Sequence, residues 1–155
     1  MPEDMPPPQA AAATEHFVDG YLLYLLAAVS HGASGQFHAH VRKQGLKVPE
    51  WRVLATLHDQ DGAMVTTLAR ISLLEQSRLT KIIDRMESSS LVTRRPDPAD
   101  ARRVRVFLTY TGRELAEQLV KDARAHEAEL LQRLPAADAQ ALKPVLQALL
   151  KRLEP

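Results

Sequence analysis

The chain has 155 residues, of which 45% are hydrophobic and 25% are charged, and its formal net charge is +1. This length and composition are typical of one globular domain with its own core. There is no run of about 18 apolar residues, so we expect no membrane span. Cysteine is absent, which excludes disulfides, a thiol redox sensor and a thiolate metal site.

The first 13 residues are rich in Pro and Ala and carry two acids but no basic residue. A signal peptide begins with a basic segment. We therefore predict a disordered tail over 1–13, a single domain over 14–155 and a cytoplasmic location.

Hydrophobic periodicity predicts six helices and two short strands, and it indicates no internal repeat. The helices are expected over about 15–44, 49–60, 66–73, 77–89, 112–133 and 137–153, with the strands between the fourth and fifth helices. The predicted fold is therefore mainly α with a small β-hairpin.

Capping and proline signals refine these bounds. Pro49 suits the first turn of its helix. Thr66 and Thr67 offer N-cap hydroxyls to the third helix. Thr111 and Glu114 are expected to form a capping box at the start of the fifth helix. Pro144 should bend or shorten the last helix, because proline lacks an N–H and clashes with the preceding turn.

Residues 66–109 predict a helix-turn-helix followed by a wing. The second helix of the motif carries an apolar stripe made of Leu79, Ile82, Ile83 and Met86. Its opposite face can donate to phosphates and to base edges, chiefly through Ser77, Arg78, Thr80 and Lys81. An isolated face of this kind is usually just solvated, but the short helix before it favours recognition of DNA.

After the second helix the pattern changes to the two-residue period of a half-buried strand. Residues 91–95 and 103–108 predict paired strands, joined by a turn over 96–102. The hairpin is basic through Arg94, Arg95, Arg102, Arg103 and Arg105.

Charge is unevenly distributed along the chain. Residues 78–105 carry a net charge of +4, whereas the remainder carries −3. A basic module inside an acidic scaffold is the electrostatic signature of a nucleic-acid reader.

The terminal helices are apolar over more than one side, which indicates a second surface that buries them. The alternative is an intramolecular core. We favour a homodimer, because a reader of symmetric operators needs two recognition helices about 34 Å apart. The apolar residues concerned are Phe17, Tyr21, Leu22, Tyr24, Leu25, Leu26, Val29 and Phe37 in the first helix and Leu142, Val145, Leu146, Leu149, Leu150 and Leu153 in the last.

Catalysis finds no support in the motifs, since a Gly-rich phosphate loop, a nucleophile elbow and an HExxH pair are all missing. His31, Ser34 and His38 share one helix face, with Trp51 expected nearby. This face is consistent with solvated or core histidines, with a metal site or with a ligand pocket. No acidic partner stands at helical spacing, so we predict no metal and no cofactor.

Between Pro49 and Leu119 a series of short motifs is similar to that of the MarR family of bacterial transcriptional regulators. The motifs are Glu50-Trp51-Arg52-Val53-Leu54, Thr67-Leu68-Ala69, Ser77-x-x-Thr80-Lys81, Asp84-Arg85-Met86-Glu87, Leu91-Val92, Arg94-Arg95, Asp100-x-Arg102 and Leu108-Thr109-x-x-Gly112-Arg113. Two positions depart from the pattern. Ser90 stands where the family usually has Gly, so it must tolerate a backbone conformation that Gly adopts freely, and Arg103 replaces a small residue and adds a cation to the wing.

The resemblance implies a winged helix-turn-helix, with a DNA-binding lobe over 46–110 and dimerisation helices over 14–45 and 111–155. It implies a homodimeric regulator, more often a repressor, on a palindromic DNA operator. Arg102 is expected at the minor groove, oriented by Asp100. The remaining wing arginines are assigned to phosphates or to structural pairing.

The resemblance also implies a crevice for small aromatic effectors. An aromatic acid or phenol would suit a lining of polar donors beside aromatic rings, which we assign to Tyr24, His31, Ser34, His38 and Trp51. The alternatives are a protein-interaction module that binds no DNA and a metal-responsive regulator of the same fold.

Overall fold

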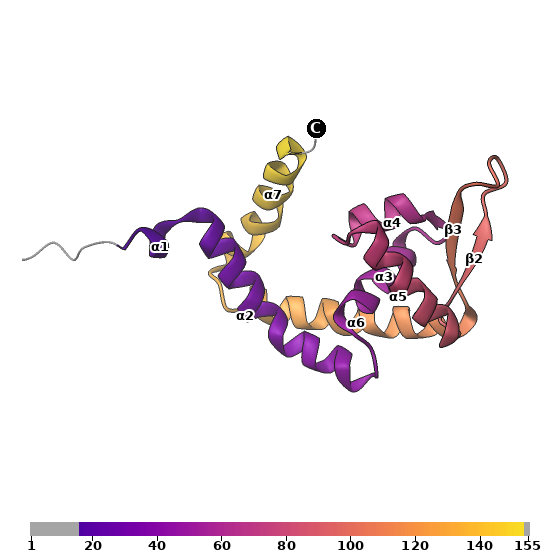
Figure 1. Cartoon of the computed structure of the whole chain (residues 1–155). Coiled ribbons are helices and arrows are strands. Elements are labelled where there is room, and N and C mark those ends of the chain that lie inside the picture. The colour runs from indigo at the N-terminus through magenta and orange to yellow at the C-terminus, as the bar shows by residue number, and fades with distance from the viewer. Residues whose placement is uncertain (1–15, 154–155) are drawn as a thin grey trace, which may run out of the picture. The chain divides into compact units, whose positions relative to one another are not determined.

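The computed structural model describes residues 16–153 (Figure 1). The tail predicted over 1–13 lies outside the described residues. The chain divides into two compact units, one ending at Gly35 and the other beginning at Gln36. Each unit is described by itself below.

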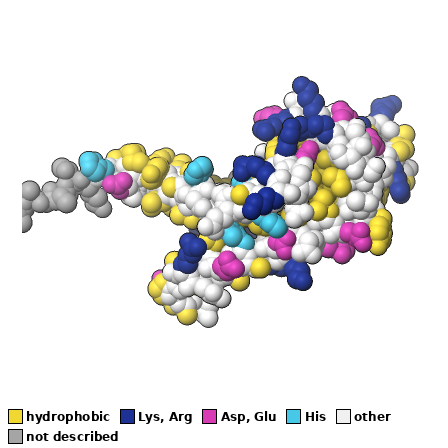
Figure 2. Space-filling view, turned by 90° about the horizontal axis from the view of Figure 1, so that it is seen from below, with side chains coloured by type: hydrophobic (Ala, Val, Ile, Leu, Met, Phe, Trp, Pro, Cys, Tyr) yellow, Lys and Arg dark blue, Asp and Glu magenta, His cyan; other side chains and the backbone are white. Residues whose placement is uncertain are grey.

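The N-terminal unit contains α1 (Phe17–Gly20) and the first part of α2 (Leu22–Lys43). A single helix was predicted from residue 15 onward, which is wrong at Tyr21, where the backbone is extended. Gly20 just before it weakens helix propensity, and this favours a break. Large apolar side chains of both helices are exposed, and Figure 2 shows hydrophobic atoms over much of the segment that follows the grey trace.

The second unit contains the end of α2 and all later elements. These are α3 (Val48–Asp59), β1 (Ala63–Met64), α4 (Val65–Ile71), α5 (Gln76–Ser88), β2 (Val92–Pro96), β3 (Val104–Leu108), α6 (Tyr110–Leu131) and α7 (Ala136–Leu153). Figure 1 shows α3, α4 and α5 grouped together, with the β2–β3 hairpin projecting from the group. The predicted fold class, mainly α with a small wing, is confirmed.

The described residues form a three-stranded antiparallel sheet in the order β1-β3-β2. Val92 pairs with Leu108 and Pro96 with Val104, so the predicted hairpin is present. The two-residue strand β1 was not predicted, because it is too short to show an alternating pattern. It pairs Ala63 with Val106 and fixes the wing to the end of α3.

The core of this unit lies between α3, α4, α5, α6 and the sheet. The predicted stripe of α5 is buried: Leu79, Ile82, Ile83 and Met86 are all almost fully covered. Its neighbours include Leu54 and Leu68 from the two preceding helices. Burial of this stripe fixes which face of α5 remains exposed.

Two of the expected caps are wrong. Helix α6 begins at Tyr110, and its N-cap is Thr109, whose hydroxyl oxygen accepts a hydrogen bond from the Gly112 N–H at 3.0 Å. Helix α4 begins at Val65, with Met64 as its N-cap. Both helices begin earlier in the chain than predicted from Thr66, Thr67 and Thr111. The reason is that pairing with the sheet positions the residue that precedes each helix.

The two prolines behave differently. Pro49 lies in the first turn of α3, as predicted, and the Lys47 N–H donates to Glu50 Oε2 at 2.7 Å there. Pro144 lies inside α7, which nevertheless runs unbroken to Leu153, so the predicted shortening is not found. No helix among the described residues has the length and apolar content needed to cross a membrane.

Candidate nucleic-acid interface

The exposed face of α5 presents the polar side chains expected from the sequence. Ser77, Arg78, Thr80 and Lys81 are all exposed. The Thr80 hydroxyl donates to the Gln76 carbonyl oxygen at 3.0 Å. Its donor is therefore used within the helix, and its methyl group and oxygen lone pairs remain for contacts outward.

The wing loop is closed by backbone hydrogen bonds. The Asp97 N–H donates to the Arg103 carbonyl at 2.8 Å, and the Arg103 N–H donates to the Asp100 carbonyl at 2.9 Å. Arg102 and Arg103 are exposed at the end of this loop. They extend the basic surface beyond the strands.

Asp100 acts differently from the expectation. Its carboxylate accepts the backbone N–H of Arg102 at 3.0 Å and lies 3.6 Å from the Arg103 guanidinium. It therefore orders the backbone at Arg102, while its side-chain partner is Arg103. The side-chain hydrogen bond expected between Asp100 and Arg102 is not found among the described contacts.

The other wing arginines divide into paired and exposed side chains. Arg94 is bound by Asp84 and Glu87, and Arg105 by Asp97 and the Gly62 carbonyl. Arg95 lies over the Phe107 ring, 4.9 Å from its centroid, and remains exposed. The structure thus favours structural pairing for Arg94 and Arg105, whereas Arg95 still has donors free to face a phosphate.

A groove of about 530 Å³ lies between α5 and the wing. Polar side chains in its lining include Thr66, Gln76, Thr80, Arg94, Arg102 and Arg103. Sequence reasoning missed Thr66 as a lining residue and Gln76 altogether. Helical spacing could have found Gln76, because it stands four residues before Thr80 and so shares its face.

The residues expected at an effector site are divided between the two units. Tyr24, His31 and Ser34 belong to the N-terminal unit, where the Ser34 hydroxyl approaches the His31 carbonyl at 3.5 Å. His38 and Trp51 belong to the second unit. The assignment of these five residues to one site stays a prediction.

Within the second unit, aromatic rings and imidazoles from three helices gather around Phe37. Trp51 meets this ring edge-on at 5.3 Å, and the imidazoles of His40 and His126 lie within 6 Å of it. His40 Nε2 also contacts Asp122 Oδ2 at 2.8 Å. The Nε2 atom of His126 is buried without a hydrogen-bond partner among the described residues. Sequence reasoning missed His126 and Asp122, since both lie far along the chain from the helix that carries His38.

His38 is the histidine of this region whose protonation is disfavoured. Burial, together with the nearby charges of Arg42 and Arg52, lowers the pKa of His38 below its usual value of 6.5. This shift favours a neutral imidazole, which can donate one hydrogen bond and accept another. Among residues 16–153, no group of three or more His, Asp or Glu side chains is arranged to hold a metal ion.

A short positioning helix, a second helix with an exposed polar face, and a basic wing on a small antiparallel sheet together define a winged helix-turn-helix protein. Comparison with known proteins specifies the family. Residues 46–104 match the family model described as MarR. The chain is 58% identical to the MarR family transcriptional regulator SPO1453 of Silicibacter pomeroyi. The superposition on that crystal structure includes 90% of this chain and 100% of SPO1453, with a TM-score of 0.83.

More distant relatives agree. The transcriptional repressor IacR of Pseudomonas putida is 29% identical over 92% of this chain and 86% of its own length. The structure of BpsR from Bordetella bronchiseptica is 25% identical, with a TM-score of 0.76 over 87% of this chain and 96% of that chain. The chain belongs to the MarR family of transcriptional regulators. It is a DNA-binding regulator and not an enzyme.

Proposed function

We propose that the protein is a homodimeric repressor that binds a palindromic DNA operator and leaves it when a small aromatic acid or phenol binds. The observation that carries this proposal is the groove between α5 and the wing, with the side chains of Gln76 and Arg102 in its lining. A recognition helix enters the major groove with its N-terminal residues at the base edges. The wing then reaches the adjacent minor groove, where a narrow groove attracts arginine.

The DNA contact proposed for each residue follows from the chemistry of its side chain. Ser77, Arg78 and Lys81 are exposed donors on α5 and are assigned to phosphates and base edges. Gln76 stands at the first position of α5, where its amide can form two hydrogen bonds with an adenine edge. Arg102 is assigned to the minor groove, and Arg95 and Arg103 to phosphates.

The first experiment identifies the operator. DNA that co-purifies with crosslinked protein is sequenced, and the enriched duplex is titrated with the full chain by fluorescence anisotropy at several salt concentrations. We expect a site with two-fold symmetry and an affinity that falls steeply with salt, because binding releases counterions from the phosphates. Enrichment of no sequence, together with salt-independent binding, would contradict the proposal.

Dimerisation is supported by α7. This helix has 18 residues, and its large apolar side chains are all exposed in the single chain: Leu142, Val145, Leu146, Leu149, Leu150 and Leu153. Exposed apolar patches of this extent mark interaction surfaces. We assign this surface to a second copy of the chain, since one symmetric dimer supplies the two recognition helices that a palindrome requires.

Repression, rather than activation, is supported by the relatives. IacR of Pseudomonas putida and the relative from Mycobacterium tuberculosis, which is 29% identical over 84% of this chain, are both named as repressors. We extend that activity to this chain. A reporter gene placed behind the enriched operator should therefore be more active when the chain is absent.

The effector proposal rests on the rings around Phe37. A mostly apolar lining with a few polar groups is typical of sites for small molecules, and the buried Nε2 of His126 provides a polar atom with no hydrogen-bond partner in the part of the chain that the structure describes. DNA binding by BpsR is regulated by 6-hydroxynicotinic acid, which is a small aromatic acid. We propose a ligand of the same class here, held by Trp51, His126 and His38, with Tyr24, His31 and Ser34 retained as candidates in the N-terminal unit.

Trp51 is the single tryptophan and offers a direct readout. A panel of benzoates, hydroxypyridine carboxylates and phenols is screened for changes in its fluorescence and for release of the operator. A true effector should change the Trp51 fluorescence and also release the operator. His126→Phe should weaken this response to the effector while operator affinity stays intact. His58→Phe, which alters a histidine on the later part of α3, is the matched control. A panel that changes neither signal would exclude this class of ligand.

A further inference from the structure

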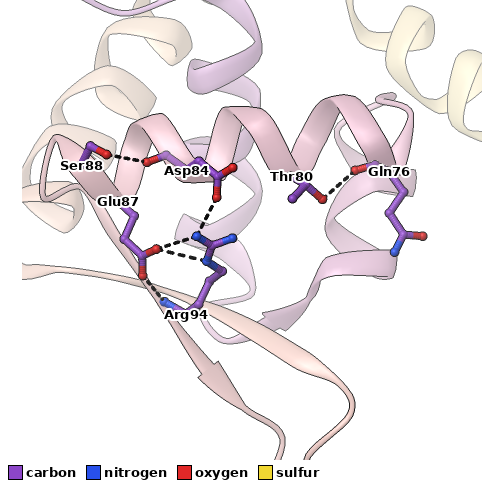
Figure 3. A network of polar contacts seen from close by, with 6 residues as sticks. All are labelled: Gln76, Thr80, Asp84, Glu87, Ser88 and Arg94. Carbon is purple, nitrogen blue, oxygen red and sulfur yellow. Dashed lines mark hydrogen bonds and ion pairs between the residues drawn. The ribbon is translucent and has the colours of Figure 1, made fainter.

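Arg94 is the centre of a polar network that joins the wing to the recognition helix. From β2, its Nη2 lies 2.6 Å from Asp84 Oδ1 and 2.8 Å from Glu87 Oε2, and its Nε donates to the same Glu87 oxygen at 3.1 Å. The Arg94 backbone N–H donates to the other Glu87 oxygen at 3.1 Å. Figure 3 shows the guanidinium lying between the two carboxylates, with both acids on α5.

Electrostatics within this network favours the charged forms of Glu87 and Arg94. Hydrogen bonds from the Arg94 backbone and side chain lower the pKa of Glu87 below its usual range. Hydrogen bonds to Glu87 and then to Asp84 raise the pKa of Arg94 above its usual range. These shifts favour the ion pair between Arg94 and Glu87, and charge-assisted hydrogen bonds of this kind have restrictive geometry.

The position of Arg94 explains what the network does for the DNA-binding surface. Gln76, Thr80 and Asp84 follow one another at four-residue spacing along α5, and the first two line the groove together with Arg94 itself. An unpaired carboxylate at Asp84 would repel the phosphates of any DNA near this groove. Arg94 neutralises it, and in doing so commits its Nε and Nη2 donors to carboxylates of α5.

The start of β2 is also held next to α5 by apolar packing, since Val92 is buried in the same core cluster as Ile83 and Met86. The connection from α5 to β2 is only the three residues 89–91, and its Ser90 has a positive φ of 57°. On the far side of the hairpin, Arg105 binds the Gly62 carbonyl. Among the described residues, the Arg94 network is thus the polar side-chain contact that joins the recognition helix to β2.

We infer that Arg94 is a positioning residue, which together with Asp84 and Glu87 locks the wing onto the recognition helix and masks the charge of Asp84. It is not a phosphate contact. This inference rests on the proposed DNA binding at the same groove. The helix and the wing then meet the duplex as one rigid surface, so that the spacing between Gln76 and Arg102 is set before DNA arrives.

The salt dependence of DNA binding separates positioning from phosphate contact. A residue that neutralises one phosphate contributes about one unit to the slope of log affinity against log salt. We expect Arg94→Lys to weaken operator binding about tenfold with an unchanged slope, because lysine keeps the charge but cannot bind two carboxylates in the planar geometry of arginine. Normal affinity for Arg94→Lys, with a slope about one unit lower for Arg94→Ala, would make Arg94 a phosphate contact and overturn the inference.

A second measurement needs no DNA. Amide hydrogen exchange over residues 92–108 is compared in the full-length wild type, in Arg94→Met, in Glu87→Gln and in the double variant. We expect faster exchange in each single variant and little further change in the double variant, since both substitutions break the same contact. Lys121→Met on α6 is the control for loss of an exposed cation and should exchange like the wild type.

Thermal unfolding of each variant confirms that the lobe is folded before these comparisons. Unchanged exchange in both Arg94→Met and Glu87→Gln would overturn the locking of the wing, whatever the DNA results. If exchange increases as expected but the wild type binds no duplex, the network stands and the proposed function fails. The two hypotheses are therefore distinguishable.

Discussion

Arg105 and Asp97 pair where the wing loop begins, with the guanidinium Nε 3.0 Å from the carboxylate Oδ1. Asp97 is only 6% exposed, and Arg105 also donates from Nη1 to the Gly62 carbonyl at 2.9 Å. The pair therefore connects the wing loop to the turn after α3. Together with the Arg94 network, it attaches the hairpin to the lobe on both sides.

Loss of the Arg105 side chain should destabilise the folded chain. Arg105→Ala leaves the buried carboxylate of Asp97 without its charged partner, which costs about 1–3 kcal/mol. Urea unfolding followed by circular dichroism measures the change. Arg103→Ala, which removes an exposed arginine from the same hairpin, is the control and should change the midpoint little; equal midpoints for all three proteins would contradict the structural role.

Arg102 should contribute to DNA affinity through its charge. The side chain is exposed at the end of the wing loop, and its backbone is held by Asp100. Arg102→Ala should weaken operator binding and lower the salt slope by about one unit, with no loss of thermal stability. The measurement is anisotropy at a series of salt concentrations, with Lys121→Ala as control. An unchanged slope would remove Arg102 from the interface.

Gln76 should contribute to sequence specificity rather than to general affinity. Its amide stands at the first residue of α5, and its own carbonyl is already used by Thr80. Gln76→Ala should reduce discrimination at one base pair of each half-site by about 1–3 kcal/mol while the salt slope stays the same. Competition between operator variants substituted at single positions tests this. Uniform weakening on every sequence would instead place Gln76 at a phosphate.

The sequence could predict those features that are determined by residues close together in the chain. The four-residue apolar stripe of α5 and the alternation in β3 are local patterns, and both were correctly interpreted. The strained turn after α5 was also foreseen, because a serine stands where related chains carry glycine. The structure gives Ser90 a φ of 57°, in the region that glycine adopts freely.

The features that sequence reasoning missed depend on contacts between different elements of the fold. The partners of Arg94 and Arg105 could not be chosen from spacing, because a guanidinium in a basic hairpin can equally face a phosphate or an acid. Asp97 becomes a partner of Arg105 when β2 pairs with β3, and Gly62 does so only when β1 pairs with β3. The imidazoles around Phe37 likewise come from helices that are far apart in the chain.

Charging the apolar surface of α7 should abolish dimerisation without unfolding the DNA-binding lobe. Leu146 and Leu149 are both exposed in the single chain, so their loss removes no core contact there. Leu146→Asp and Leu149→Asp should each yield a folded monomer, because burying an unpaired carboxylate in an interface is costly. Light scattering reports the mass, and Gln147→Asp on the same helix is the control. A wild-type monomer at micromolar concentration would exclude the dimer.

The last prediction concerns pH and rests on His38. Its pKa is lowered in the folded chain by burial and by the charges of Arg42 on α2 and Arg52 on α3. The unfolded chain binds the proton more readily, so stability from this group is complete above pH 6.5 and is lost as the pH falls through the folded-state value. His38→Gln, which cannot be protonated, should therefore lose less stability than the wild type between about pH 7.5 and about pH 5.5. Urea midpoints at several pH values give this difference directly.

His31→Gln is the control because His31 is exposed, and it should follow the wild type. Arg52→Gln removes one cause of the shift, so an NMR titration of the His38 ring in that variant should give a pKa closer to 6.5. Parallel stability curves for the wild type and His38→Gln would show that the surroundings of His38 do not oppose its charge.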